Sequence, residues 1–184
     1  MIVGLAGYHS SGKSVLAEFL AKEFGWQWIV KRELLKNWSG SGDDECVWTD
    51  WYRSLYDKMG SYEIMHHLLR RVGYTKNDRG VAVLDSIHTP DEWRAVKEVD
   101  PNAILAGVFI PKECRLQRSS PQDLVLDIKR ERYWHTGNSQ SCLLAEVEWS
   151  FSGMANSDLR QLEAKAFFEH LTASGKINRV LFDP

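Results

Sequence analysis

One glycine-rich segment near the N-terminus holds the residues whose spacing indicates the most specific chemistry. The segment Gly7-Tyr8-His9-Ser10-Ser11-Gly12-Lys13-Ser14 fits the pattern G-x-x-x-x-G-K-[ST] at every fixed position. Glycines let the backbone bend closely around a phosphate, and successive N–H groups bind anions together with the positive end of a following helix. The sequence therefore predicts a phosphate-binding loop whose nucleotide contacts come from Gly7, His9, Ser10, Ser11, Gly12, Lys13, Ser14 and Val15.

Two further groups belong with such a loop. Lys13 is expected to reach the β- and γ-phosphates of ATP, and the Ser14 hydroxyl is expected to bind Mg²⁺. An acidic side chain at a strand end is also required, and Asp85, which follows the apolar run 81–84, is the best candidate. An aspartate in this place is also favoured as a turn residue or a helix cap. The predicted cofactors are ATP and Mg²⁺, with Ser14 and Asp85 as the metal-binding residues.

Arginines after the third apolar run are candidates for stabilising a transferred phosphoryl group. Arg115 and Arg118 are one helical turn apart, and Arg130 follows in the run Lys129-Arg130-Glu131-Arg132. Each of them alone is equally well read as a solvated surface charge. The predicted catalytic residues are Lys13, Asp85, Arg115, Arg118 and Arg130.

The phosphate-binding loop needs a strand before it and a helix after it. The apolar run 1–6 reads as a buried strand, and residues 13–24 have apolar side chains at helical spacing. Further strands are expected over 27–30, 80–85, 103–110, 147–152 and 180–182, and further helices over 32–38, 49–72, 91–99, 124–133 and 157–173. Because strands and helices alternate, we expect a mostly parallel sheet covered on both faces.

Composition narrows the class of protein. The 184 residues are 43% hydrophobic and 26% charged, which suits a single globular domain over 1–184 and excludes a disordered or coiled-coil chain. A net charge of -2 argues against a surface built mainly for nucleic acid. Three cysteines without metal-ligand spacing favour reduced thiols. With no apolar run that could span a bilayer, a cytoplasmic location and no membrane partner are expected.

The chain resembles P-loop nucleotide kinases of the adenylate kinase and dephospho-CoA kinase type, and in arrangement a small group of archaeal kinase-like ATPases. The resemblance rests on residues 2–14, on 83–88, and on 114–118 and 129–131, which are similar to the two ends of a lid. It implies an α/β P-loop NTPase fold with a five-stranded, mostly parallel sheet and helices on both faces. It also implies a short lid over 115–132, an acceptor-binding helical insert over 31–72, and Asn156 in the loop beside the adenine.

The function that this resemblance implies is transfer of the ATP γ-phosphoryl group to a nucleotide or nucleotide-like acceptor. Lys31, Arg32 and Arg53 would then meet the anionic group of the acceptor. His88 stands where the family has an acceptor-binding arginine, and Ser86 replaces a glycine. These departures, together with the short lid, indicate an unusual acceptor.

Two other functions remain open from the sequence. Five of the eight tryptophans lie at 26, 28, 38, 48 and 51. They fit either core packing or an aromatic platform, and a platform would suit a kinase acting on a nucleic-acid end or a modified base. The second alternative is a nucleotide-binding regulatory protein whose degenerate lid supports no transfer. The sequence leaves the oligomeric state open.

Overall fold

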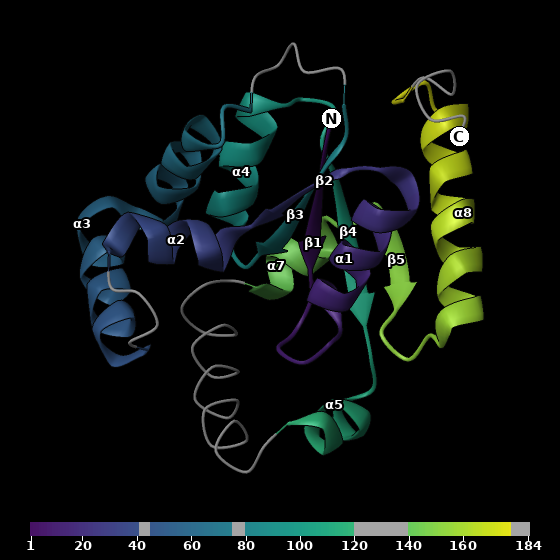
Figure 1. The fold of residues 1–184 in the computed structure, drawn as a ribbon, viewed down its shortest axis with the longest axis horizontal. Coiled ribbons are helices and arrows are strands. Elements are labelled where there is room, and N and C mark those ends of the chain that lie inside the picture. Colours follow the sequence, from purple (N-terminus) through teal and green to yellow (C-terminus); the bar gives the residue numbers. More distant parts are fainter. Residues whose placement is uncertain (41–44, 75–79, 120–139, 178–184) are drawn as a thin grey trace.

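The structure, a computed structural model, describes residues 1–40, 45–74, 80–119 and 140–177. Its centre is one five-stranded sheet in the order β2-β3-β1-β4-β5, in which all neighbouring strands are parallel (Figure 1). The prediction of a parallel sheet is therefore confirmed. The strands are β1 (Ile2–Ala6), β2 (Gln27–Val30), β3 (Ala82–Ile87), β4 (Ile104–Phe109) and β5 (Trp149–Ser152).

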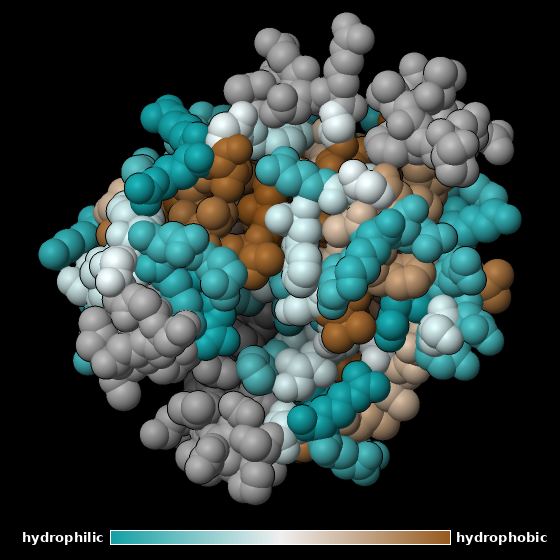
Figure 2. Space-filling model, in the orientation of Figure 1, coloured by the Kyte–Doolittle hydropathy of each residue, from teal (hydrophilic) through white to brown (hydrophobic). Residues whose placement is uncertain are grey.

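Helices cover both faces of this sheet and both of its edges. Helices α2 and α3 lie together beside the β2 edge, and α8 lies beside β5 (Figure 1). On the face of the molecule that is seen in Figure 2, hydrophobic side chains gather in the central part, and hydrophilic side chains lie mostly around them. The helices are α1 (Lys13–Phe24), α2 (Lys31–Ser39), α3 (Glu45–Arg71), α4 (Pro90–Val99), α5 (Lys112–Arg118), α7 (Gln140–Ala145) and α8 (Ser157–Ala173).

The sequence of β1 explains why both faces are covered. Successive side chains of a strand point to opposite faces, and all five residues of β1 are buried. Val3 and Leu5 pack in a core with residues of α1 and α8, whereas Ile2 and Ala6 pack in a second core with residues of α3 and α4. A strand that is apolar on both faces is stable only between two layers of helices.

Strand β3 is longer than the sequence predicts. The prediction ends this strand at Asp85, whereas the structure continues it to Ile87. The register explains the difference, because Leu5 pairs with Asp85 but Ala6 pairs with Ile87, which leaves Ser86 as the extra residue of a bulge. Ile87 is fully buried, so the polar residues at 85 and 86 interrupt the apolar run without ending the strand.

Other elements also differ from the expectation. Helix α3 begins at Glu45 and contains a non-helical residue at Gly60, whose φ is 75°. Helices α5 and α7 are too short to give a clear apolar period, and neither was predicted. The helix expected over 124–133 and the strand expected over 180–182 lie outside the described residues. Among the helices that the structure describes, none combines the length and apolar character needed to cross a membrane.

Candidate active site

The phosphate-binding loop joins the carboxyl end of β1 to α1, at the centre of the sheet. Gly7 has a φ of 148° and Gly12 a φ of 96°, both in the region that favours glycine. A Cβ atom on Gly7 would lie 2.6 Å from the carbonyl oxygen of Val108 in β4. Gly7 is therefore required both by its backbone conformation and by the close approach of the neighbouring strand.

Lys13 closes the loop on itself. Its ammonium group donates to the carbonyl oxygens of Gly7, at 3.0 Å, and Tyr8, at 2.7 Å. This places a positive charge beside the loop, as binding of a polyphosphate requires. Lys13 thus lies where the sequence predicts a phosphate-binding cation.

The N-terminus of α1 differs from those of α4 and α8. Helix α4 is capped by the Thr89 hydroxyl, and α8 by the side chain of Asn156. The first turn of α1 has neither a side-chain cap nor an acidic residue. The partial positive charge of this helix end is therefore not offset by a local carboxylate, and it suits an anionic ligand.

Asp85 lies beside the loop from the neighbouring strand. It pairs in register with Leu5 of β1 and with Val30 of β2, and it is 9% exposed. Ser14 is in the first turn of α1. A carboxylate and a hydroxyl are hard oxygen ligands of the kind that Mg²⁺ prefers, and Mg²⁺ in nucleotide sites takes most of its other ligands from phosphates and water. Within the described ranges no group of three or more His, Cys, Asp or Glu could hold a metal by itself.

The two arginines of α5 have different surroundings. Arg115 is only 3% exposed, and its guanidinium carbon lies 5.5 Å from the ring centroid of Tyr8 in the loop. Arg118 is exposed and donates to the carbonyl oxygen of Gly153 at 2.9 Å. Arg115 is therefore buried against the loop, whereas Arg118 is exposed and contacts the segment after β5. Arg130 lies outside the described residues.

A pocket of about 210 Å³ opens between the loop and the segment after β5. A Cβ atom on Gly153 would lie 2.3 Å from the carbonyl oxygen of Ser11, so this segment contacts the loop directly. The Asn156 side chain accepts from the Leu159 N–H at 2.9 Å, and Asn156 is not among the residues that line the pocket. The pocket is lined by Gly12, Val15, Leu16, Val108, Arg118, Ser152, Gly153 and Arg160.

Gly153 and Arg160 are site residues that the sequence analysis did not identify. A glycine directly after a strand is a common turn signal, so only the close approach to Ser11 distinguishes Gly153. Arg160 follows α8's cap and donates to the carbonyl oxygen of Ala155 at 2.9 Å. No spacing rule connects it with a loop near the N-terminus.

Inside the loop, His9 faces other residues of the site. Its Nδ1 atom lies 2.9 Å from the Ser10 hydroxyl, which in turn accepts from the Ser119 hydroxyl at 3.2 Å. Ser10 has a φ of 57°, which is unusual for a residue other than glycine. These contacts link the loop to the end of α5.

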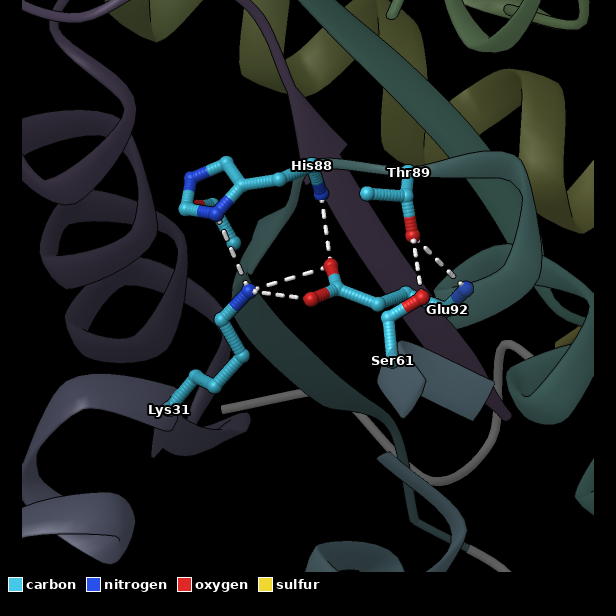
Figure 3. Close-up of polar contacts among 6 residues, drawn as sticks. Lys31, Ser61, His88, Thr89 and Glu92 are labelled. Atoms are coloured by element: carbon cyan, nitrogen blue, oxygen red, sulfur yellow. Dashed lines mark hydrogen bonds and ion pairs between the residues drawn. The ribbon is translucent and has the colours of Figure 1, made fainter. Parts of the chain in front are cut away.

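On the other side of Asp85, the structure brings together two of the four predicted acceptor-binding residues. The Lys31 ammonium lies 3.0 Å from both carboxylate oxygens of Glu92 and 3.1 Å from Nδ1 of His88 (Figure 3). Nε2 of His88 lies 2.9 Å from the Ser86 hydroxyl. Arg53 is instead on the exposed surface of α3, 3.3 Å from Asp50.

Arg32, the residue after Lys31 in α2, is exposed.

Glu92 was not predicted as a site residue, although the sequence contains a signal for it. Thr89 and Glu92 have the spacing of a capping box, in which a threonine is followed by a glutamate three residues later. In the structure the Glu92 N–H donates to the Thr89 hydroxyl at 3.1 Å.

Several of the described tryptophans pack against other side chains of the core or of the helical insert. Trp26 is 4% exposed in the core between the sheet and α8. Trp38 stacks on His67 with ring centroids 4.0 Å apart, and it meets Trp51 edge-on at 5.6 Å. Trp28 is the most exposed of these, at 38%. Core packing therefore accounts for Trp26, and a small cluster within the helical insert accounts for Trp38 and Trp51.

Known proteins with a similar structure were found, although none was found from the sequence. The sequence matches no protein-family model and no curated protein. The structure is similar to that of shikimate kinase from Aquifex aeolicus, with a TM-score of 0.58 and 15% identity over 95% of this chain and 98% of that chain. It is also similar to shikimate kinase from Acinetobacter baumannii in complex with shikimate, with a TM-score of 0.57 and 14% identity over 96% and 95% of the two chains.

A third similar structure is shikimate kinase from Bacteroides thetaiotaomicron, with a TM-score of 0.58 and 10% identity over 94% of this chain and 98% of that chain. At such identities the likeness concerns the fold. The chain has the fold of a P-loop kinase over nearly its whole length, which confirms the α/β P-loop fold that the sequence predicts.

Proposed function

We propose that the protein is an ATP- and Mg²⁺-dependent phosphotransferase that moves the γ-phosphoryl group of ATP to a small molecule. The observation that supports this most directly is the juxtaposition of the phosphate-binding loop with Asp85 at the carboxyl edge of the sheet. Ligands of open parallel sheets bind at this edge. The fold shared with shikimate kinases supports the same class of reaction.

The residues of the site have separate roles in this proposal. Lys13 and the amides of the loop bind the β- and γ-phosphates, and Ser14 and Asp85 hold Mg²⁺, which neutralises charge that develops on the phosphates. Arg118, which lines the pocket beside Gly12 and Gly153, contacts the nucleotide, while Arg115 positions the loop through its contact with Tyr8. We assign the pocket between Val15, Arg118 and Gly153 to the base of the nucleotide. Catalysis then depends on positioning and electrostatics.

The acceptor binds, in this proposal, on the β2 and β3 side of Asp85, beneath helices α2 and α3. A nucleotide acceptor follows from the resemblance to nucleotide kinases, and one similar structure contains shikimate, a small hydroxylated acid. Both kinds of acceptor offer an oxygen nucleophile to the γ-phosphorus. The cytoplasm, with its ATP and Mg²⁺, is the proposed location.

ADP release tests this function. Purified protein with MgATP is mixed in turn with nucleoside monophosphates, nucleosides, dephospho-CoA, shikimate and single-stranded DNA, and ADP is measured. We expect ADP release that depends on one acceptor class and that falls at least about 100-fold in Lys13→Ala, because the β/γ-phosphate contact is lost. Lys22→Ala is the matched control, since Lys22 lies on the same helix with its side chain 75% exposed.

The outcomes separate the candidate functions. Undiminished turnover in Lys13→Ala would overturn the proposal. MgATP binding without ADP release for any acceptor would instead favour a nucleotide-binding regulatory protein. Release that depends only on single-stranded DNA would favour the nucleic-acid kinase.

A further inference from the structure

Next to Asp85, a polar cluster is formed by Lys31, Ser86, His88 and Glu92, of which His88 is half-buried and the other three are buried. Lys31 comes from the start of α2, Ser86 from the bulge of β3, and Glu92 from the first turn of α4. The side chains of Lys31 and Glu92 are 7% and 4% exposed. Three separate elements thus place these groups at the carboxyl edge of β2 and β3.

The direction of the hydrogen bonds in this cluster follows from the chemistry of Lys31. An ammonium group only donates, so Nδ1 of His88, at 3.1 Å, must accept and therefore carries no proton. The proton of the neutral imidazole is then on Nε2, which donates to the Ser86 hydroxyl at 2.9 Å. Having accepted this bond, the Ser86 hydroxyl presents its own proton as a donor.

The positive charge of Lys31 is balanced within the cluster. Its ammonium lies 3.0 Å from both oxygens of the Glu92 carboxylate. One of these oxygens also accepts from the backbone N–H of His88 at 2.7 Å, which fixes the carboxylate between α2 and the end of β3. Lys31 and Glu92 together contribute no net charge to this edge of the sheet.

An acceptor phosphate or carboxylate in a partly buried site is bound most strongly by charged donors whose positive charge is not already neutralised. The Lys31–Glu92 pair does not supply such a charge, and a neutral His88 does not either. The bulge at Ser86 supplies instead a polar side chain with no partner residue on β1. Hydrogen bonding to a neutral oxygen is the interaction that these groups can offer.

We propose that the acceptor is recognised at this edge through an uncharged hydroxyl group, which hydrogen-bonds to Ser86, while His88, Lys31 and Glu92 are positioning residues: His88 orients the Ser86 hydroxyl, and Lys31 and Glu92 keep His88 neutral and oriented. This proposal rests on the phosphotransferase function and narrows its substrate class to hydroxylated acceptors that carry no phosphate or carboxylate at this place. The reaction breaks the bond between the γ-phosphorus and the β–γ bridging oxygen, so that ADP leaves, forms a bond from the acceptor oxygen to the γ-phosphorus, and releases the hydroxyl proton to solvent water.

Matched acceptor pairs test the proposal. Each nucleoside is compared with its own monophosphate, and methyl shikimate with shikimate, by measuring kcat/KM for ADP release with MgATP. We expect the uncharged member of the effective pair to be preferred at least about tenfold, since the charge of Lys31 at this edge is already balanced by Glu92. Preference for the monophosphate or the carboxylate overturns the inference and leaves the phosphotransferase function standing. ADP release with neither member of any pair, despite MgATP binding, overturns the phosphotransferase function itself.

Glu92→Gln provides the reverse experiment, because it leaves the charge of Lys31 without its carboxylate. In this variant we expect the preference to shift at least about tenfold toward the anionic member of the pair. Asp91→Asn is the matched control, since it removes the same charge from the exposed side of the same helical turn. A purely structural role of Glu92 would lower the yield of folded protein in Glu92→Gln without changing this ratio, and that result also overturns the inference.

A measurement on the wild-type protein keeps the proposal testable even where a variant folds poorly. Nitrogen-15 NMR of the histidine side chains, with His88 assigned by loss of its signals in His88→Gln, reports which ring nitrogen carries the proton. We expect the neutral form with the proton on Nε2 at pH 7. An imidazolium or a proton on Nδ1 contradicts the hydrogen-bond direction and overturns the inference.

Discussion

Replacement of Lys31 by methionine is the perturbation that tests the buried pair most sharply. The substitution keeps much of the aliphatic side chain but removes the ammonium group that pairs with Glu92. The Glu92 side chain is only 4% exposed. Breaking a buried ion pair from one side costs about 3–5 kcal/mol, because the remaining charge stays buried without its partner. Glu92 retains the hydrogen bond from the His88 N–H, so we expect the lower end, about 3 kcal/mol.

The matching single variant is Glu92→Gln, in which the lysine is left without its carboxylate, and about 3 kcal/mol is again expected. The double variant Lys31→Met/Glu92→Gln buries no charge. We therefore expect it to be no less stable than either single variant, which corresponds to a coupling energy of about 3 kcal/mol. A domain with an ordinary stability of about 5–15 kcal/mol remains folded in all three variants.

Urea denaturation followed by tryptophan fluorescence and circular dichroism measures these free energies of unfolding. The control is the exposed pair of Lys22 and Glu18 on α1, whose side chains are 75% and 46% exposed. Lys22→Met is expected to change stability by about 0.5 kcal/mol or less. A loss of the same small size in Lys31→Met, or additive losses in the double variant, would refute the reasoning, because either result means that the pair is hydrated and uncoupled in solution.

Two further predictions concern the nucleotide side of the site. In Gly153→Ala the new Cβ would lie 2.3 Å from the Ser11 carbonyl oxygen, so the phosphate-binding loop must shift; we expect MgATP affinity by calorimetry to fall at least about tenfold. Gly80→Ala, where no atom lies within 4 Å of the new Cβ, should bind as the wild type does. Arg118→Ala should weaken MgATP binding or transfer with a change of about 0.5 kcal/mol or less in stability, since Arg118 is exposed. Arg115→Ala should instead lower the melting temperature, because Arg115 is 3% exposed beneath the loop, and equal melting temperatures for the two variants would contradict this division of roles.

The sequence alone was sufficient for the features that depend on local pattern. The predicted bounds of α1, β2 and α8 agree with the structure. The two helices have apolar side chains at helical spacing, and their ends carry strong signals, such as Gly25 after α1. The phosphate-binding loop was predictable for the same reason, since its function requires a fixed spacing of glycine, lysine and serine within one short segment.

Features that depend on contacts between distant segments could not be predicted in this way. The continuation of β3 past Asp85 depends on pairing with β1, and the approach of Gly153 to Ser11 joins segments far apart in the chain. Arg115 and Arg118 have the same residue type on the same short helix, and only packing makes one of them buried and the other exposed.

The acceptor side illustrates this limit most clearly. The resemblance to nucleotide kinases implied that Lys31, Arg32 and Arg53 meet the anionic group of the acceptor, and that His88 stands in the place of an acceptor-binding arginine. The tertiary structure brings Glu92, 61 residues along the chain, within 3.0 Å of Lys31 and balances its charge. The sequence thus determined which chemical groups are available and predicted where phosphates bind, whereas the net charge at this edge of the sheet was decided by folding, because charge compensation depends on distance in space and not on position along the chain.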